Sequence, residues 1–195
     1  ICKTIKLFFG KDELCFYLNK NNYIKFVKRW DYRKYKLTKK HHSILRDYYR
    51  FDKKNLSAKS KNLKNFIDAK LIEGKFLVGI HIRRGDYKKW SKGKYYFEDE
   101  FYKYIIKNLK IKLTKDNKDP LFIVVSNEKI NSKIGMDLFS GGSWKEDQII
   151  LQSCNLIVGP PSTFTMWASY ISKIPLIELN SKDNEINFNG IVCEG

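Results

Sequence analysis

Cysteine is scarce in this chain, and its four cysteines form no cluster. They are scattered along the sequence, with no CxxC pair and no nearby histidine at the spacing of metal ligands: Cys2, Cys15, Cys154 and Cys193. This scatter argues against a zinc site and against a disulfide framework. The chain is therefore expected to be a soluble, reduced protein without a metal site.

Long apolar runs are absent too. No run approaches the roughly 20 residues of a membrane helix, and the first residues lack the charged, apolar and cleavage regions of a signal peptide. We therefore expect no integral membrane segment and a cytoplasmic location. Because the chain begins at Ile1 rather than at methionine, a preceding anchor and a membrane-peripheral location stay open as alternatives.

The chain has few acidic residues, with 21 Asp+Glu against 38 Lys+Arg, and its formal net charge is +17. Lysine is spread over the whole chain and accompanies Asn, Ile, Tyr and Phe, which are all encoded by A/T-rich codons. A nucleic-acid-binding protein would more often gather its basic residues on one element and carry a recognisable reading motif. We therefore expect no specific nucleic-acid partner, and a basic module for RNA or another polyanion remains the alternative.

The chain changes character near Lys75. Residues 1–74 are aromatic and basic, and the stretch 14–30 is predicted to be rich in strands. Residues 61–75 are predicted to form a helix that ends at Gly74, because four apolar residues recur at helical spacing: Leu63, Phe66, Ile67 and Leu71. We interpret residues 1–74 as a partial N-terminal region and residues 75–195 as a complete domain.

Short strands and helices alternate from Lys75 onward. The apolar runs 75–82, 120–126, 155–159 and 174–179 are predicted strands, and helices are predicted at 98–113, at 145–154 and after 160. In the helix at 98–113 one face is assigned to the apolar residues Phe101, Tyr104, Ile105, Leu109 and Leu113. The alternation predicts an α/β fold with a doubly wound, parallel, Rossmann-like sheet. Ligands of such sheets bind at the carboxyl ends of the strands.

The first strand ends in the peptide GIHIRRGDY, which concentrates charge at that edge. Alternation along the strand places His81 and Arg83 on one face and Arg84 on the other. Arginine suits a phosphate, because its planar fork donates two parallel hydrogen bonds. Arg83 could instead pair with Asp86 and pin the loop, and His81 could be a satisfied core residue. The Arg-Gly-Asp tripeptide, at the end of a buried strand, is a weak signal for an integrin ligand.

The second loop, GPPSTFTMWASY, follows the strand at 155–159. Gly159 allows close approach of a ligand, and Ser162 and Thr163 stand where a helix begins. A helix N-terminus favours phosphate, although these hydroxyls could simply cap the helix. Asp147, after Glu146 at the start of another helix, could accept hydrogen bonds from a guanine edge or stabilise that helix. The GxGxxG and Walker fingerprints are absent.

These peptides together resemble those of a known family. VGIHIRRGDY is similar to the HxRRGDY peptide of the family 11 glycosyltransferases, the α-1,2-fucosyltransferases, and more distantly to the HxRR peptides of α-1,6- and protein O-fucosyltransferases. FIVVSNE resembles their second motif, and EDQIILQSCNLIVGPPSTFTMWASYISKIPLIEL resembles their third. The GGLGNQ-type peptide of the family's N-terminal domain is missing.

The resemblance implies a GT-B-type enzyme that moves fucose from GDP-fucose to a glycan acceptor in an α-1,2 linkage, with inversion and without a metal ion or other cofactor. It implies that residues 75–195 are the GDP-sugar-binding domain and that residues 1–74 are a partial region on the acceptor side. Another nucleotide-sugar-dependent transferase on the same kind of sheet is the alternative. It implies that Arg83 holds the β-phosphate, that His81 and Asp147 contact the nucleoside, and that Ser162, Thr163 and Phe164 line the pyrophosphate pocket. Arg84 is counted with these donor-binding residues. Asp86 and Asp99 are candidates for the base that takes the acceptor's proton, and Asp86 is placed with Arg83 as catalytic.

Overall fold

The computed structural model describes residues 4–9, 12–18, 24–28, 39–49, 56–130 and 134–181. The chain forms two compact units, Ile1–Leu45 and Arg46–Gly195. Cys2 and Cys193 lie outside the described residues. The division into functional regions at residue 74 stays a prediction.

The first unit contains a three-stranded antiparallel sheet in the order β1-β2-β3. Its strands are β1 (Thr4–Phe9), β2 (Asp12–Leu18) and β3 (Ile24–Lys28). The stretch 14–30, predicted to be strand-rich, contributes part of β2 and all of β3. Helix α2 (His42–Tyr49) spans the boundary between the two units.

The second unit is built on a five-stranded sheet in the order β6-β5-β4-β7-β8, with every neighbouring pair parallel. Its strands are β4 (Lys75–Ile82), β5 (Asp119–Ser126), β6 (Leu138–Phe139), β7 (Leu156–Gly159) and β8 (Leu176–Glu178). The four strands predicted from apolar runs are confirmed. The two-residue β6 was not predicted, because so short a strand has no periodicity to detect.

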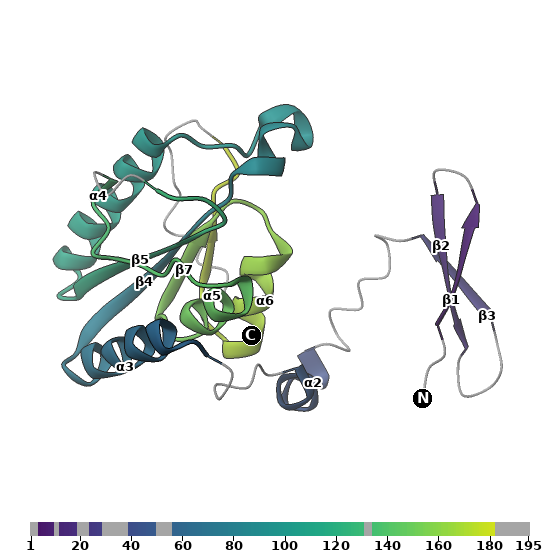
Figure 1. The fold of residues 1–195 in the computed structure, drawn as a ribbon, viewed down its shortest axis with the longest axis horizontal. Helices are drawn as coiled ribbons and strands as arrows, with labels where there is room; N and C mark the ends of the chain where they lie inside the picture. The colour runs from purple at the N-terminus through teal and green to yellow at the C-terminus, as the bar shows by residue number, and fades with distance from the viewer. Residues whose placement is uncertain are drawn as a thin grey trace. The chain divides into compact units, whose positions relative to one another are not determined.

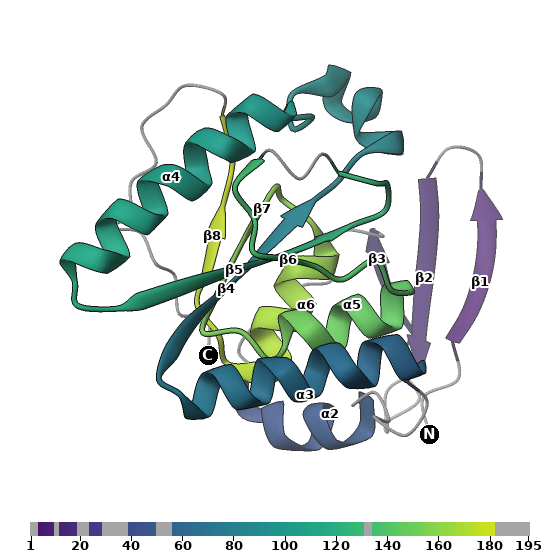
Figure 2. The same ribbon diagram turned by 60° about the vertical axis from the view of Figure 1, so that its left-hand side comes forward.

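Helices cover both faces of this sheet (Figures 1 and 2). Helix α4 (Asp99–Lys115) lies on one face, and helices α3 (Ala58–Ile72), α5 (Trp144–Leu151) and α6 (Thr163–Ser172) lie on the other. The α/β class and the parallel, doubly wound sheet are therefore confirmed. None of the helices among the described residues is long and apolar enough to cross a bilayer.

Side chains of β4 alternate between two cores. Val78, Ile80 and Ile82 pack in the core that contains the buried face of α4, whereas Leu77 packs with Ile67 of α3 in the other core. At Gly79 an added Cβ would lie 2.7 Å from Leu151 Cδ2, so glycine lets the end of α5 approach the sheet. This alternation sends His81 and Arg84 to opposite faces, as predicted.

Two aromatic residues that the helical spacing assigned to apolar faces are exposed in the structure. Tyr104 of α4 and Phe66 of α3 are both 41% exposed, although both were assigned to the apolar sets of their helices. In α4 the buried face is centred instead on Tyr102, Ile105, Ile106, Leu109 and Leu113. Tyr104 is two residues from both Tyr102 and Ile106, so at 100° per residue it points away from that face.

The connections place a topological switch point between β4 and β7. The chain leaves β4 through α4 and returns beside it as β5, whereas it leaves β7 through α6 and returns on the far side as β8. Neighbouring strands whose connections run in opposite directions mark the point at which such sheets bind ligands. The loops after β4 and β7 are therefore brought to the predicted position.

Candidate functional site

His81 stands near the end of β4 and is 3% exposed. Burial, with a further effect of the Arg83 charge, lowers the pKa of His81 to about 3, so the imidazole is neutral at physiological pH. Its Nδ1 has no hydrogen-bond partner among the residues that the structure describes. A buried polar nitrogen without a partner is costly, and a ligand hydrogen bond would remove that cost.

Gly159 permits the close approach of β7 to β4 at this point. A Cβ on Gly159 would lie 3.0 Å from His81 Cβ and 3.1 Å from the His81 carbonyl oxygen. The carbonyl oxygen is a backbone atom and Cβ is attached directly to the backbone, so neither atom can move away by a side-chain rotation. The sequence suggested that Gly159 made room for a ligand, whereas the structure shows that it makes room for the neighbouring strand.

Helix α6 begins beside His81. Ser162 is its N-cap, because the Phe164 N–H donates to Ser162 Oγ at 3.1 Å. Thr163 is exposed, and the Phe164 ring lies 5.1 Å from the His81 ring, centroid to centroid. The capping alternative therefore holds for Ser162. The start of α6 still carries partial positive charge, since capping leaves other N–H groups of the first turn outside the helical ladder.

Arg83 is half-exposed and pairs with Asp86. Its Nε lies 3.0 Å from Asp86 Oδ1, and its Nη2 donates to Asp86 Oδ2 at 3.2 Å. This is the loop-pinning pair considered as the alternative to phosphate binding. A side chain on the surface can exchange such a pair for a ligand, because exposed ion pairs contribute only about 0 to 1 kcal/mol.

Tyr87 joins the two loops and was not identified from the sequence. Its hydroxyl donates to the Pro161 carbonyl oxygen at 2.6 Å. The Arg83 guanidinium lies over the same ring, 5.7 Å from its centroid. Arg83 is thereby held beside the peptide that leads into α6. The only sequence signal for this role was an aromatic residue directly after the charged peptide.

Arg84 points the other way and is 5% exposed. Its guanidinium donates to the Phe97 carbonyl oxygen and to Asp99, while its backbone N–H donates to Asn127 Oδ1 at 2.9 Å. The structure thus does not bring Arg84 together with His81 and Phe164. Its burial also speaks against the Arg-Gly-Asp tripeptide as an exposed recognition loop.

Asp147 lies in the first turn of α5 and is 6% exposed. Burial raises the pKa of Asp147 to about 6, against the opposing effect of a hydrogen bond from Ser140 Oγ at 2.5 Å. Its neighbour Gln148 donates to the Phe164 carbonyl oxygen at 2.6 Å, which ties α5 to the start of α6. Asp147 itself bonds to Ser140, and the residue of α5 that reaches Phe164 is Gln148.

Glu146 has a structural role that the sequence left undecided. It forms a capping box with Ser143 at the start of α5, and its Oε1 also accepts from Ser57 N at 2.9 Å and from Ser57 Oγ at 2.5 Å. Ser57 is the N-cap of α3. These hydrogen bonds hold the pKa of Glu146 well below its usual range. One carboxylate thus caps two helices.

The ends of β4 and β7 carry groups that can bind a phosphate ester. They are a half-exposed guanidinium, a neutral histidine and a helix N-terminus, all at one edge of the sheet. Such groups can stabilise negative charge that develops on a leaving phosphate. Among the described residues there is no group of three or more His, Cys, Asp or Glu side chains that could hold a metal ion.

Comparison of the sequence with known proteins identifies a family. The model described as "Glycosyl transferase family 11" matches residues 18–189. The chain is 32% identical over 110 residues to "Galactoside alpha-(1,2)-fucosyltransferase 2" of Mus musculus, covering 49% of this chain and 30% of that protein. It is 30% identical over 111 residues to "Galactoside alpha-(1,2)-fucosyltransferase 1" of Rattus norvegicus, covering 52% of this chain and 29% of that protein. No solved structure matches the chain.

Proposed function

The chain belongs to glycosyl transferase family 11, and from this premise we propose that it transfers L-fucose from GDP-β-L-fucose to a glycan hydroxyl, with inversion to an α-1,2 linkage. The chain spans about 30% of the length of the curated relatives it matches. We further propose that its parallel sheet is the donor-binding domain of a GT-B enzyme. A cytoplasmic location stays a prediction.

One observation carries this proposal: the two strand-end loops meet at the switch point of the sheet. Tyr87 and Pro161 join them, so that Arg83 and the start of α6 lie at one edge of the sheet. In the proposed complex Arg83 leaves Asp86 for the β-phosphate, and Ser162 and Thr163 contact the diphosphate. His81 Nδ1, which the described residues leave without a partner, bonds to the nucleoside portion, and Phe164 packs beside it.

The reaction itself needs charge stabilisation and a base. The acceptor oxygen attacks C1 of fucose, the bond between C1 and the phosphate oxygen breaks, and its electron pair stays on GDP. Arg83 and the α6 N-terminus stabilise that charge. The acceptor proton passes to a carboxylate, for which we propose Asp86, since it is released when Arg83 moves to the phosphate. Asp99 is the second candidate, and its carboxylate is held by Arg84.

We expect GDP to bind at least about tenfold more tightly than ADP or UDP, because ionised Asp147 can accept two hydrogen bonds from a guanine edge. The pKa of Asp147 is about 6, and GDP requires the ionised form. Affinity for GDP relative to ADP should therefore be constant above about pH 6 and fall as the pH drops below it. Titration calorimetry at several pH values measures both effects, with ADP correcting for phosphate protonation.

Asp147→Asn should reduce the difference in affinity between GDP and ADP and remove the pH dependence of that difference. Asp116→Asn changes an exposed residue at the end of α4 and should alter neither the difference nor its pH dependence. Equal affinity of the wild-type protein for the three nucleotides would contradict the guanine assignment.

Transfer should not depend on a divalent cation, because we propose that Arg83 and the α6 N-terminus supply the charge stabilisation. Millimolar EDTA is expected to lower the rate of transfer from GDP-fucose by less than about twofold. The assay compares GDP-fucose, GDP-mannose and UDP-galactose, each with and without chelator. Strict dependence on Mn²⁺ or Mg²⁺, or preference for the UDP-sugar, would point to another glycosyltransferase chemistry.

A further inference from the structure

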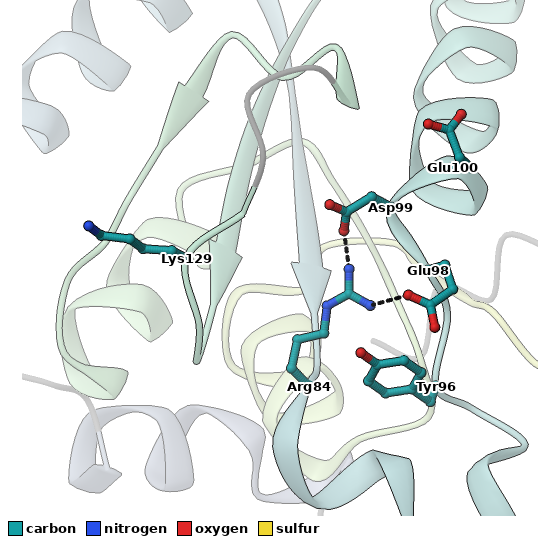
Figure 3. Close-up of a pocket in the computed structure, with 6 residues that line it drawn as sticks. All are labelled: Arg84, Tyr96, Glu98, Asp99, Glu100 and Lys129. Atoms are coloured by element: carbon teal, nitrogen blue, oxygen red, sulfur yellow. Dashed lines mark hydrogen bonds and ion pairs between the residues drawn. The ribbon is translucent and has the colours of Figure 1, made fainter.

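A hollow of about 400 Å³ lies on the α4 side of the β4 end (Figure 3). It is lined by Arg84, Tyr96, Glu98, Asp99, Glu100 and Lys129. Arg84 follows β4 and Lys129 follows β5, and these paired strands end together, with Ile82 opposite Ser126. The hollow therefore lies at the same carboxyl edge of the sheet as the proposed donor site, and its volume lies in the range of about 300–1,000 Å³ of small-molecule sites.

The lining disfavours a second phosphate. Three carboxylates stand against two cations, since Glu98, Asp99 and Glu100 are acidic and only Arg84 and Lys129 are basic. A diphosphate would meet net repulsion in such a site. A neutral sugar would not, because each hydroxyl can donate to a carboxylate and accept from an ammonium group. The Tyr96 ring adds an apolar surface against which the C–H face of a sugar ring can pack.

Two groups in the hollow are held in place before any ligand arrives. The buried Arg84 guanidinium pairs with Asp99, lies 3.9 Å from Glu98 Oε2 and stands 5.1 Å from the Tyr96 ring centroid. Asp99 and Glu98 nevertheless keep 38% and 73% of their side chains exposed, and Glu100, 85% exposed, pairs with Lys103 at 3.5 Å. Figure 3 shows the guanidinium between Asp99 and Glu98. The fixed position of Arg84 and Asp99 lowers the entropic cost of binding there.

We propose that this hollow binds the hexose of the acceptor glycan, an inference that rests on the fucosyl transfer proposed above. Arg83 and Arg84 are consecutive but face opposite sides of β4, so a donor at Arg83 and an acceptor at Arg84 meet across the strand end. Asp99 and Glu100 accept hydrogen bonds from sugar hydroxyls, and Tyr96 packs against the ring. Arg84 acts as a positioning residue that orients Asp99.

Lactose, a galactoside, is the probe, and the test uses Glu100→Gln and Tyr96→Ala. Glu100→Gln, at a side chain that is 85% exposed, spares the buried pair of Arg84 and Asp99, whereas Tyr96→Ala also removes the ring that stands 5.1 Å from the Arg84 guanidinium. Each variant is expected to raise the KM for lactose by about tenfold, since one charge-assisted hydrogen bond or one ring contact is lost. The dissociation constant of GDP should stay unchanged. Saturation-transfer NMR of lactose in the presence of GDP should show the same loss of binding without turnover.

Asp116→Asn, which also removes an acidic charge from the α4 segment, is the matched control and should alter neither value. The inference is overturned if both variants bind lactose like the wild-type protein, or if the wild-type protein gives no lactose signal. Failure of the proposed function looks different: GDP does not bind, or no fucose is transferred. A lactose signal that the variants abolish would in that case still locate the sugar site.

Discussion

Replacing Arg83 by lysine is expected to lower the turnover of fucose transfer by about 100- to 1,000-fold, while the protein stays folded. Lysine keeps the charge but loses the fork that can bind two phosphate oxygens at once. The Arg83 side chain is 36% exposed and its ion pair is with a 60% exposed Asp86, so little stability depends on it. Steady-state kinetics with GDP-fucose, together with thermal unfolding, separate the two effects.

Arg46→Lys is the matched control, because Arg46 is also an exposed arginine paired with an aspartate, Asp47, at 3.2 Å. It should leave turnover unchanged. If Arg83→Lys retains near-wild-type turnover, Arg83 merely pins the loop, and the catalytic charge must come from elsewhere, with Arg84 as the next residue to replace.

Glu146→Gln is expected to lower the free energy of unfolding by about 2–4 kcal/mol and the melting temperature by about 5–15 °C. The carboxylate accepts hydrogen bonds at the starts of both α3 and α5. A glutamine has one oxygen, so its amide group must face a backbone N–H at one of the two helices. Denaturant unfolding of both proteins measures the loss.

The stability lost in Glu146→Gln should become smaller as the pH falls. Because the pKa of Glu146 is depressed in the folded protein, its contribution is fully present above the unfolded value of about 4.3 and disappears as the pH falls through the folded value. The two proteins should therefore converge in stability in strong acid. Glu73→Gln, at an exposed pair with Lys70, should cost less than about 1 kcal/mol. An equally small cost for Glu146→Gln would show that the double cap contributes little.

Local patterns in the sequence were sufficient for the sheet and for the edge that carries the site. The buried run 75–82 and the loop 160–163 are recognised by alternation and by helix-start residues, and parallel strands must bring their carboxyl ends to one edge. These patterns alone therefore predict that His81, Arg83 and the start of α6 lie together. The patterns also separated His81 from Arg84, because a period of two residues assigns each to its own face.

Only the tertiary structure determined which role each of two neighbouring polar residues has. The bond from Tyr87 to Pro161 joins residues 74 positions apart, and those from Ser57 to Glu146 join residues 89 positions apart. Likewise, Arg84 is buried against Asp99 while the adjacent Arg83 stays at the surface. Sequence periodicity operates within one helix or strand, whereas these partners are set by how α3, α4, α5 and α6 pack on the sheet. A charged residue's role then depends on which distant groups the packing brings within hydrogen-bond reach.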